Sequence, residues 1–197
     1  MSTRLPTEER QAGIVVAALR RARDVSPGLV TTAELAADVG ITQGAVFKHF
    51  PTKDAIWLAA MGWVREGLLA AVDAAAARAA SPMRALEAVF AAHVDFIVAH
   101  PGVPRLIFHE LQRPADSLIK REVRGLLREY RKRVQRLLQA AVDAGEAAPG
   151  VDLEAASTLF LGVVQGLVVQ SMAAGGPAAM KTQAGAVFAL FRRGIAP

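Results

Sequence analysis

The sequence has no cysteine, one tyrosine and two tryptophans among its 197 residues. Without cysteine the chain forms no disulfides, thiolate nucleophiles or thiolate metal ligands. Aromatic residues amount to 6%, and the alternating Val, Ile and Thr residues that indicate strands are scarce. Hydrophobic residues reach 53%, with alanine the commonest, and this composition favours helices. We therefore predict an all-α fold of about nine helices.

Motifs of the common enzyme classes are also missing. The chain has no phosphate-binding glycine loop, no dinucleotide fingerprint, no G-x-S-x-G sequence and no carboxylate pair placed for acid–base chemistry. Four residues are candidate metal ligands, but their spacing gives no compact pair on one turn: His93, His100, His109 and Glu110. We predict no enzymatic activity, no cofactor and no metal, with His93 and His109 in a core or a pocket.

No export or membrane segment is predicted. The first ten residues are polar and lack signal-peptide character. Residues 155–180 carry no charge, and their length alone would suit a membrane span. Ser157, Gln165 and Gln170 interrupt this run, however, and flanking anchors are missing. Because a helix that is apolar on every side is more often buried, we predict a cytoplasmic protein with a buried helix here and no membrane partner.

The net charge of +5 is compatible with a nucleic-acid partner, but its distribution is not informative by itself. Residues 1–60 hold seven Lys and Arg against six Asp and Glu, a net charge of only +1. The surplus lies between Arg113 and Arg136, on a basic amphipathic helix predicted over 117–144. This helix is either a solvated face or a docking face for an anionic ligand or partner.

Two short helices joined by a tight turn are predicted near the N-terminus. Thr31 and Glu34 have the spacing of a capping box, with a hydroxyl at the N-cap and a carboxylate three residues later. Gly40 ends the first helix, because glycine accepts positive φ without steric cost. Thr42 caps the second helix, which Pro51 stops. A helix, a glycine-containing turn and a second capped helix form a helix-turn-helix pattern.

Longer helices are predicted on both sides of this motif. The first runs from an N-cap at Thr7 to about residue 23, and the one after the motif opens at Lys53 behind the cap Thr52 and reaches about Ala80. Three arginines near the end of the first helix suit either the DNA backbone or a solvated helix end: Arg20, Arg21 and Arg23.

The outward residues of the second short helix, Thr42 to Phe50, suit a DNA major groove. Glutamine pairs with an adenine edge, lysine reaches guanine or phosphate, and small residues let the backbone approach closely. Threonine hydroxyls and the amides at helix N-termini donate to phosphates. The predicted DNA-binding residues are Thr31, Thr32, Thr42, Gln43, Gly44, Ala45, Phe47, Lys48, His49 and Lys53.

The run T-T-A-E-L-A-A-D-V-G-I-T-Q-G-A-V-F-K-H-F-P-T-K-D-A-I, residues 31–56, resembles the DNA-binding domain of TetR-family transcriptional regulators. With the preceding helix, the resemblance covers roughly the first sixty residues. It implies a homodimeric repressor that reads a palindromic operator in double-stranded DNA and is released by a small-molecule effector. Phe47 stands where the family usually has a tyrosine whose hydroxyl contacts phosphate, so that contact is absent here.

The resemblance also divides the chain into a DNA-binding domain over 1–60 and a larger helical ligand-binding and dimerisation domain over 61–197. Turn residues place further helices at 82–100, 104–112, 117–144, 152–174 and 177–194. The last two resemble the family's dimerisation pair, and Gly162 and Gly166 let another helix come close. The alternative is that both helices bury in the core of one chain.

A ligand-binding cavity among the middle helices is the final prediction. It would be mostly apolar with a few polar groups, as small-molecule sites are, although plain hydrophobic core explains the same residues. The candidates are Met61, Trp63, Phe90, His93, Phe96, Ile97, Phe108, His109, Leu127 and Tyr130. The alternative function is a helical small-molecule-binding protein or enzyme with a vestigial helix-turn-helix, which Phe47 and the near-neutral N-terminal region would favour.

Overall fold

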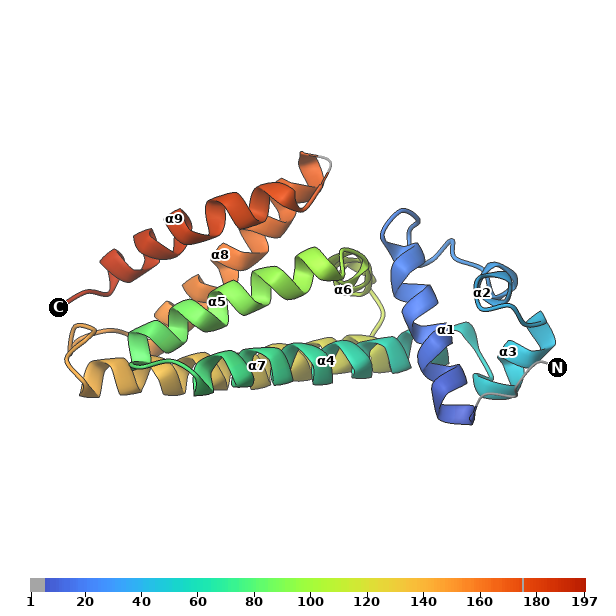
Figure 1. The fold of residues 1–197 in the computed structure, drawn as a ribbon, viewed down its shortest axis with the longest axis horizontal. Helices are drawn as coiled ribbons and strands as arrows, with labels where there is room; N and C mark the ends of the chain where they lie inside the picture. Colours follow the sequence, from blue (N-terminus) through green and yellow to red (C-terminus); the bar gives the residue numbers. More distant parts are fainter. Residues whose placement is uncertain (1–5, 175) are drawn as a thin grey trace. The chain divides into compact units, whose positions relative to one another are not determined.

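The computed structural model describes residues 6–174 and 176–197. These residues form nine α-helices and no strand (Figure 1), which confirms the all-α prediction. The helices are α1 (Thr7–Ala22), α2 (Thr32–Asp38), α3 (Gln43–His49), α4 (Lys53–Ala77), α5 (Pro82–Ala99), α6 (Gly102–Gln112), α7 (Leu118–Asp143), α8 (Leu153–Ala173) and α9 (Ala178–Gly194).

The described residues divide into two compact units. The first unit holds the residues up to Arg65 together with 100–124, and in it α6 packs on α1, which also contacts α2 and α3. The second unit holds 66–99 and 125–197. The chain passes between the units three times: inside α4, between α5 and α6, and inside α7. The division into a DNA-binding domain over 1–60 and a ligand-binding and dimerisation domain over 61–197 concerns function, and it stays a prediction.

The helix ends follow the capping residues of the sequence. Thr31 and Glu34 form both bonds of the capping box, and Thr42 accepts a bond from the backbone N–H of Ala45. Asp152 caps α8 by accepting bonds from two backbone N–H groups. Gly40 has φ of +67°, in the left-handed region that favours glycine. These predictions are confirmed.

Three predicted helix ends are wrong. Pro6, not Thr7, occupies the N-cap of α1, and it makes no side-chain bond. The helix predicted from Pro104 begins at Gly102, where a Cβ atom would overlap the Leu19 carbonyl oxygen of α1. The close packing of α6 on α1, which the sequence does not show, therefore sets this start. Finally, α4 ends at Ala77 and does not reach Ala80. In the alanine-rich run that follows, the backbone N–H groups bond to the carbonyl three residues earlier instead of four.

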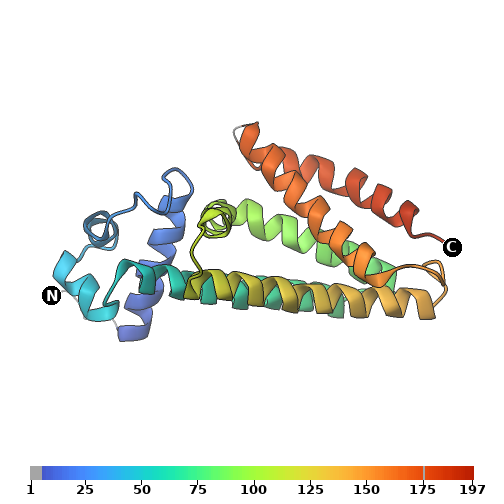
Figure 2. The same ribbon diagram turned by 180° about the vertical axis from the view of Figure 1, so that it is seen from behind.

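An aromatic core holds the second unit together. The ring of Phe160 on α8 packs edge-on against Phe90 of α5 at 5.5 Å and against Phe191 of α9 at 5.4 Å. Phe188 adds a further ring from α9, at 5.9 Å from Phe191. Helices α5, α8 and α9, which carry these rings, pack against one another and lie side by side (Figure 2).

By length and composition alone, α4 and α8 are apolar enough to cross a membrane, and so is the bent pair α5–α6. Helix α8 buries one side, including Phe160 and Val164, in the aromatic core. Its other side leaves Leu159 and Val169 half exposed in the single chain. The core of one chain therefore covers a single face of α8 and leaves the opposite face exposed.

Candidate nucleic-acid interface

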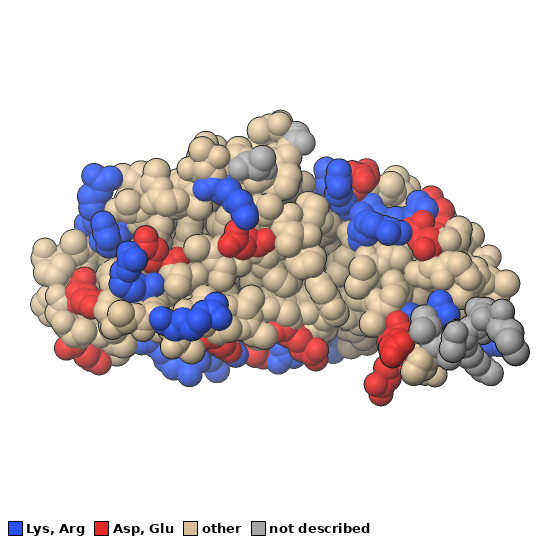
Figure 3. Space-filling view, viewed as in Figure 1, with Lys and Arg blue, Asp and Glu red and all other residues tan. Residues whose placement is uncertain are grey.

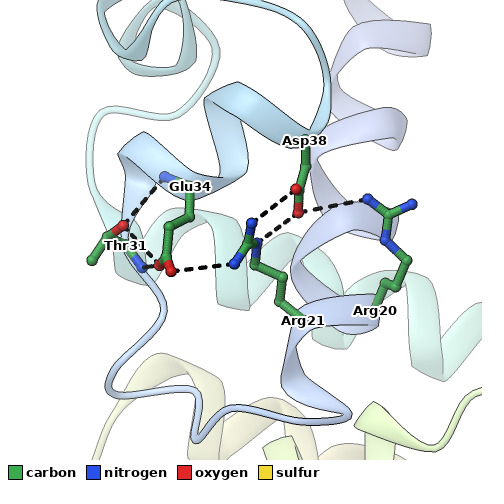
Figure 4. A network of polar contacts seen from close by, with 5 residues as sticks. All are labelled: Arg20, Arg21, Thr31, Glu34 and Asp38. Carbon is green, nitrogen blue, oxygen red and sulfur yellow. Dashed lines mark hydrogen bonds and ion pairs between the residues drawn. The ribbon is translucent and has the colours of Figure 1, made fainter.

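The helix-turn-helix is held on α1 by a network of charged groups (Figure 4). Arg21 of α1 donates from Nε and Nη2 to the two carboxylate oxygens of Asp38, at 2.6 and 2.9 Å, and from Nη1 to Glu34 at 3.2 Å. Arg20 adds a longer ion pair of 3.6 Å to Asp38. The same Glu34 accepts from the backbone N–H of Thr31 at 2.8 Å. One arginine thereby fixes both ends of α2.

This network shifts the protonation equilibria of its members. The hydrogen bond from Arg21 holds the pKa of Asp38 below its ordinary value of 3.8. The bonds from Thr31 lower the pKa of Glu34, and the bond to Asp38 raises the pKa of Arg21. Neither predicted role of Arg21, phosphate contact or solvated helix end, matches this geometry. The opposite charges of Arg21, Glu34 and Asp38 were the available signal in the sequence.

Two further residues of α1 support the motif, and sequence reasoning missed both. Arg10 donates from Nη1 to the backbone carbonyl of Val39 at 3.3 Å. Gln11 donates from Nε2 to the backbone carbonyl of His49 at 3.2 Å. Carbonyls at helix C-termini lack partners within their own helix, so α1 satisfies the ends of both α2 and α3.

Helix α3 leaves most of its surface free. Val46 is fully buried against the rest of the motif, whereas Gln43, Gly44 and Lys48 are exposed. Phe47 is 45% exposed although it is large and apolar. The exposed face therefore contains the small residue, the cation and the aromatic ring singled out from the sequence. Their contacts to DNA stay a prediction.

Five of the predicted DNA-binding side chains make hydrogen bonds within the protein: Thr31, Thr32, Thr42, Gln43 and Lys53. Gln43 donates from Nε2 to the Thr32 hydroxyl at 2.8 Å, so that the N-termini of α3 and α2 are linked. Lys53 donates from Nζ to the carbonyls of Gly28 and Val30 at 2.7 and 3.2 Å. These bonds hold the Gln43 and Lys53 side chains in defined positions beside the motif.

Surface charge does not single out this motif. On the face shown in Figure 3, Lys and Arg stand beside Asp and Glu over much of the surface, with wide uncharged areas between them. This agrees with the near-neutral balance of residues 1–60.

The residues predicted to bind a ligand fall into two groups. Four belong to the first unit, where Trp63 packs edge-on against His100 at 4.9 Å and His109 lies beside Gly28: Met61, Trp63, Phe108 and His109. Six belong to the second unit: Phe90, His93, Phe96, Ile97, Leu127 and Tyr130.

Within the second group, His93 and Tyr130 form a polar pair among aromatic rings. The Nδ1 atom of His93 lies 3.1 Å from the Tyr130 hydroxyl, and Tyr130 is 1% exposed. Burial lowers the pKa of His93 from 6.5 to about 4 and raises the pKa of Tyr130. The imidazole is therefore neutral at pH 7. No cluster of three metal-ligating side chains occurs in the described part of the chain.

The outer sides of α8 and α9 expose large apolar side chains, and the outer side of α8 between residues 155 and 173 carries no charge. Leu159, Val169 and Met172 of α8 and Leu190 of α9 are 39–63% exposed. At Gly162 and Gly166 nothing lies within 4 Å of the place where a Cβ atom would stand. Large exposed apolar patches mark interaction sites.

Two family models match the chain. The model for bacterial regulatory proteins of the tetR family matches residues 14–60, and the tetracyclin repressor-like C-terminal domain model matches residues 113–187. The chain therefore belongs to the TetR family of DNA-binding transcriptional regulators. This confirms the class that the sequence motif predicted.

Known proteins similar to the chain include a nucleoid occlusion factor and two proteins solved with coenzyme A thioesters. The nucleoid occlusion factor SlmA of Shewanella amazonensis is 22% identical over 157 residues, which cover 79% of this chain and 80% of that protein. The regulator FadR of Bacillus subtilis, solved with stearoyl-CoA, has a TM-score of 0.81 at 16% identity and covers 93% of this chain and 98% of its own. AibR, solved with isovaleryl coenzyme A and operator DNA, has a TM-score of 0.69 at 20% identity, with coverage of 81% and 85%.

Proposed function

We propose that this protein is a homodimeric, cytoplasmic transcriptional repressor that places α3 in the major groove of each half of a palindromic operator. The observation that carries the proposal is the capped helix-turn-helix with an exposed α3 face, held on α1 by Arg21. In this role Gln43 and Lys48 face base edges and phosphates. The exposed Phe47 supplies apolar contact to a thymine methyl group in place of a phosphate bond. We propose no enzymatic activity.

The dimer would form through the outer surfaces of α8 and α9. A palindromic operator requires two recognition helices related by a two-fold axis. An isologous interface suits the uncharged surface around Leu159 and Val169, because the same patch must meet itself. The side-chain-free positions at Gly162 and Gly166 allow two α8 helices to approach closely.

The effector we propose is a coenzyme A thioester. FadR and AibR, which share the fold, were solved with stearoyl-CoA and isovaleryl coenzyme A. The aromatic core of the second unit offers apolar surroundings for an acyl chain, and the neutral His93 with Tyr130 offers a polar group for a thioester carbonyl. Phe90, Phe96, Ile97 and Leu127, the other predicted ligand residues of the second unit, remain part of this proposal.

The effector releases DNA only if it binds the DNA-incompetent state more tightly. Helix α6 is placed to pass such a change to the DNA-binding helices, because it belongs to the same compact unit as α1. Its Gly102 lies directly against the Leu19 backbone, so a displacement of α6 displaces α1. Helix α1 in turn holds the ends of α2 and α3.

The test is selection of bound DNA from a random pool at two salt concentrations, followed by titration of the selected operator. We expect an enriched palindrome, salt-sensitive binding, and release by stearoyl-CoA or isovaleryl-CoA. Lys48→Ala should weaken operator binding about tenfold without changing the dimer, while Arg105→Ala, an exposed cation of α6, serves as the matched control. Failure to enrich any DNA would contradict the proposal, and release by neither thioester would contradict the effector class alone.

A further inference from the structure

The positive charge of this protein is concentrated on α7. This helix carries eight Lys and Arg and three Asp and Glu, a net charge of +5 that equals the charge of the whole chain. Several of these cations are neutralised locally. Arg133 binds both carboxylate oxygens of Asp73 at 2.8 and 3.1 Å, and Arg131 pairs with Glu154 at 3.4 Å.

A stripe of cations on the same helix has no such neutralisation. We call Arg128, Lys132 and Arg136 the α7 stripe; all three are exposed, and none has an ion-pair partner among the described residues. They are spaced four residues apart, so their Cα atoms follow one another at about 6 Å along one face. Like charges at this spacing repel each other and destabilise a helix. An anionic ligand would remove that repulsion.

The stripe borders a groove of about 510 Å³. Lys132 and Arg136 line the groove together with the amides of Gln135 and Gln139, and Leu153 at the start of α8 supplies an apolar wall. Arg133 and the carboxylate of Glu129 also line the groove, so that three cations face one anion, and an excess of one sign of charge in a cleft concentrates the electrostatic field. The groove thus combines cations, amides and an apolar wall, which together suit a phosphorylated nucleotide better than a simple anion.

We propose that this groove binds the phosphate end of a coenzyme A thioester. The proposal rests on the effector class proposed above and adds the site that would hold its charged half. Coenzyme A carries a diphosphate and a 3′-phosphate, and Lys and Arg side chains bind phosphate oxygens through charge-assisted hydrogen bonds. The amides of Gln135 and Gln139 are groups of the kind that hydrogen-bond adenine edges.

The test compares the double variant Lys132→Gln/Arg136→Gln with the control Arg78→Gln/Arg84→Gln. The control removes two exposed cations from another groove of the same unit, between α4 and α5. Calorimetric titrations use coenzyme A, 3′-dephospho-coenzyme A and pantetheine, which has no phosphate. We expect the first variant to lose about tenfold in affinity for coenzyme A, less for the dephospho form, while the control binds as the wild type does. Pantetheine binding should not differ between variants.

Each contrary result has a distinct meaning. Equal coenzyme A affinity in the two double variants overturns the assignment of the groove but leaves the effector class intact. Absence of coenzyme A binding by the wild-type protein overturns both, while the operator selection still decides whether the protein reads DNA. Weaker operator binding by Lys132→Gln/Arg136→Gln, with coenzyme A binding unchanged, overturns the proposal and assigns the stripe to DNA.

Discussion

Both compact units bury apolar side chains, but they differ in the most specific contacts between their helices. In the first, guanidinium–carboxylate bonds of 2.6 to 3.2 Å near the surface fix α2 on α1. In the second, the rings of Phe90, Phe160 and Phe191 meet in a buried cluster. Exposed ion pairs contribute little free energy and weaken with salt, whereas buried aromatic area contributes much more. In the first unit, directional hydrogen bonds between charged groups thus fix how α2 lies on α1. In the second unit, the close fit of the aromatic rings fixes how α5, α8 and α9 pack.

The largest effect should come from the second unit. Phe160→Ala removes a fully buried ring and leaves a cavity between α5, α8 and α9. We expect the free energy of unfolding to fall by about 3–5 kcal/mol, measured by urea denaturation, with no dependence of that loss on salt. Leu118→Ala is the matched control, because that side chain is 58% exposed and should change stability by less than about 0.5 kcal/mol. Similar losses in both variants would contradict the core assignment.

The polar pair inside the second unit should make stability depend on pH. Because the folded pKa of His93 is about 4, against 6.5 when unfolded, the unfolded state binds the extra proton between these values. Stability from this group is complete above pH 6.5 and declines as the pH falls toward 4, by up to about 3 kcal/mol. His93→Gln should flatten that decline in urea titrations at several pH values. A decline as steep as in the wild-type protein would refute the assignment to His93.

A smaller effect is expected where α6 meets α1. Gly102→Ala places a Cβ atom on the Leu19 carbonyl oxygen, and the forced separation should cost about 1–3 kcal/mol and weaken operator binding. Gly62→Ala in α4 is the control, because nothing lies within 4 Å of that position. Removing a helical glycine there should raise stability by about 0.5–1 kcal/mol. If the two variants unfold alike, α6 is not packed on α1 as described.

Local chemistry explains what the sequence could predict about the fold. The caps Thr31, Thr42 and Asp152 act on residues within three positions of themselves, so spacing alone revealed them. The start of α6 could not be found this way. Residue 102 has to be glycine because the backbone of α1, some eighty residues earlier in the chain, lies directly against it. Within the local sequence, Pro104 is the stronger signal for the start of a helix.

The candidate site shows the same limit. The exposed face of α3 follows from helical periodicity, and the structure leaves Gly44, Phe47 and Lys48 exposed. The support from Arg10 and Gln11 depends on carbonyls at the ends of other helices, which no periodicity encodes. The pairing of Arg21 with Asp38 was accessible as complementary charge, but only once α1 and α2 were known to pack together.

The smallest effect on stability, and the sharpest contrast between the units, should come from Arg21→Gln. The variant removes the bonds to Asp38 and Glu34, and exposed charge pairs weaken as salt screens them. We therefore expect a modest loss in melting temperature at low salt that shrinks in 1 M salt, unlike the loss from Phe160→Ala. Operator affinity should fall as well, because α2 supports α3.

The control for Arg21→Gln is Arg23→Gln, whose pair with Asp24 at 3.4 Å lies on the open surface. The pH profile separates the two variants further. Because Arg21 lowers the folded pKa of Asp38, this carboxylate stabilises the protein above pH 3.8 and less as the pH falls through its lowered value. Arg21→Gln should remove that acid-side dependence and Arg23→Gln should keep it. A salt-independent loss in Arg21→Gln would instead show that the packing of its methylene stem, and not its charge, holds α2 on α1.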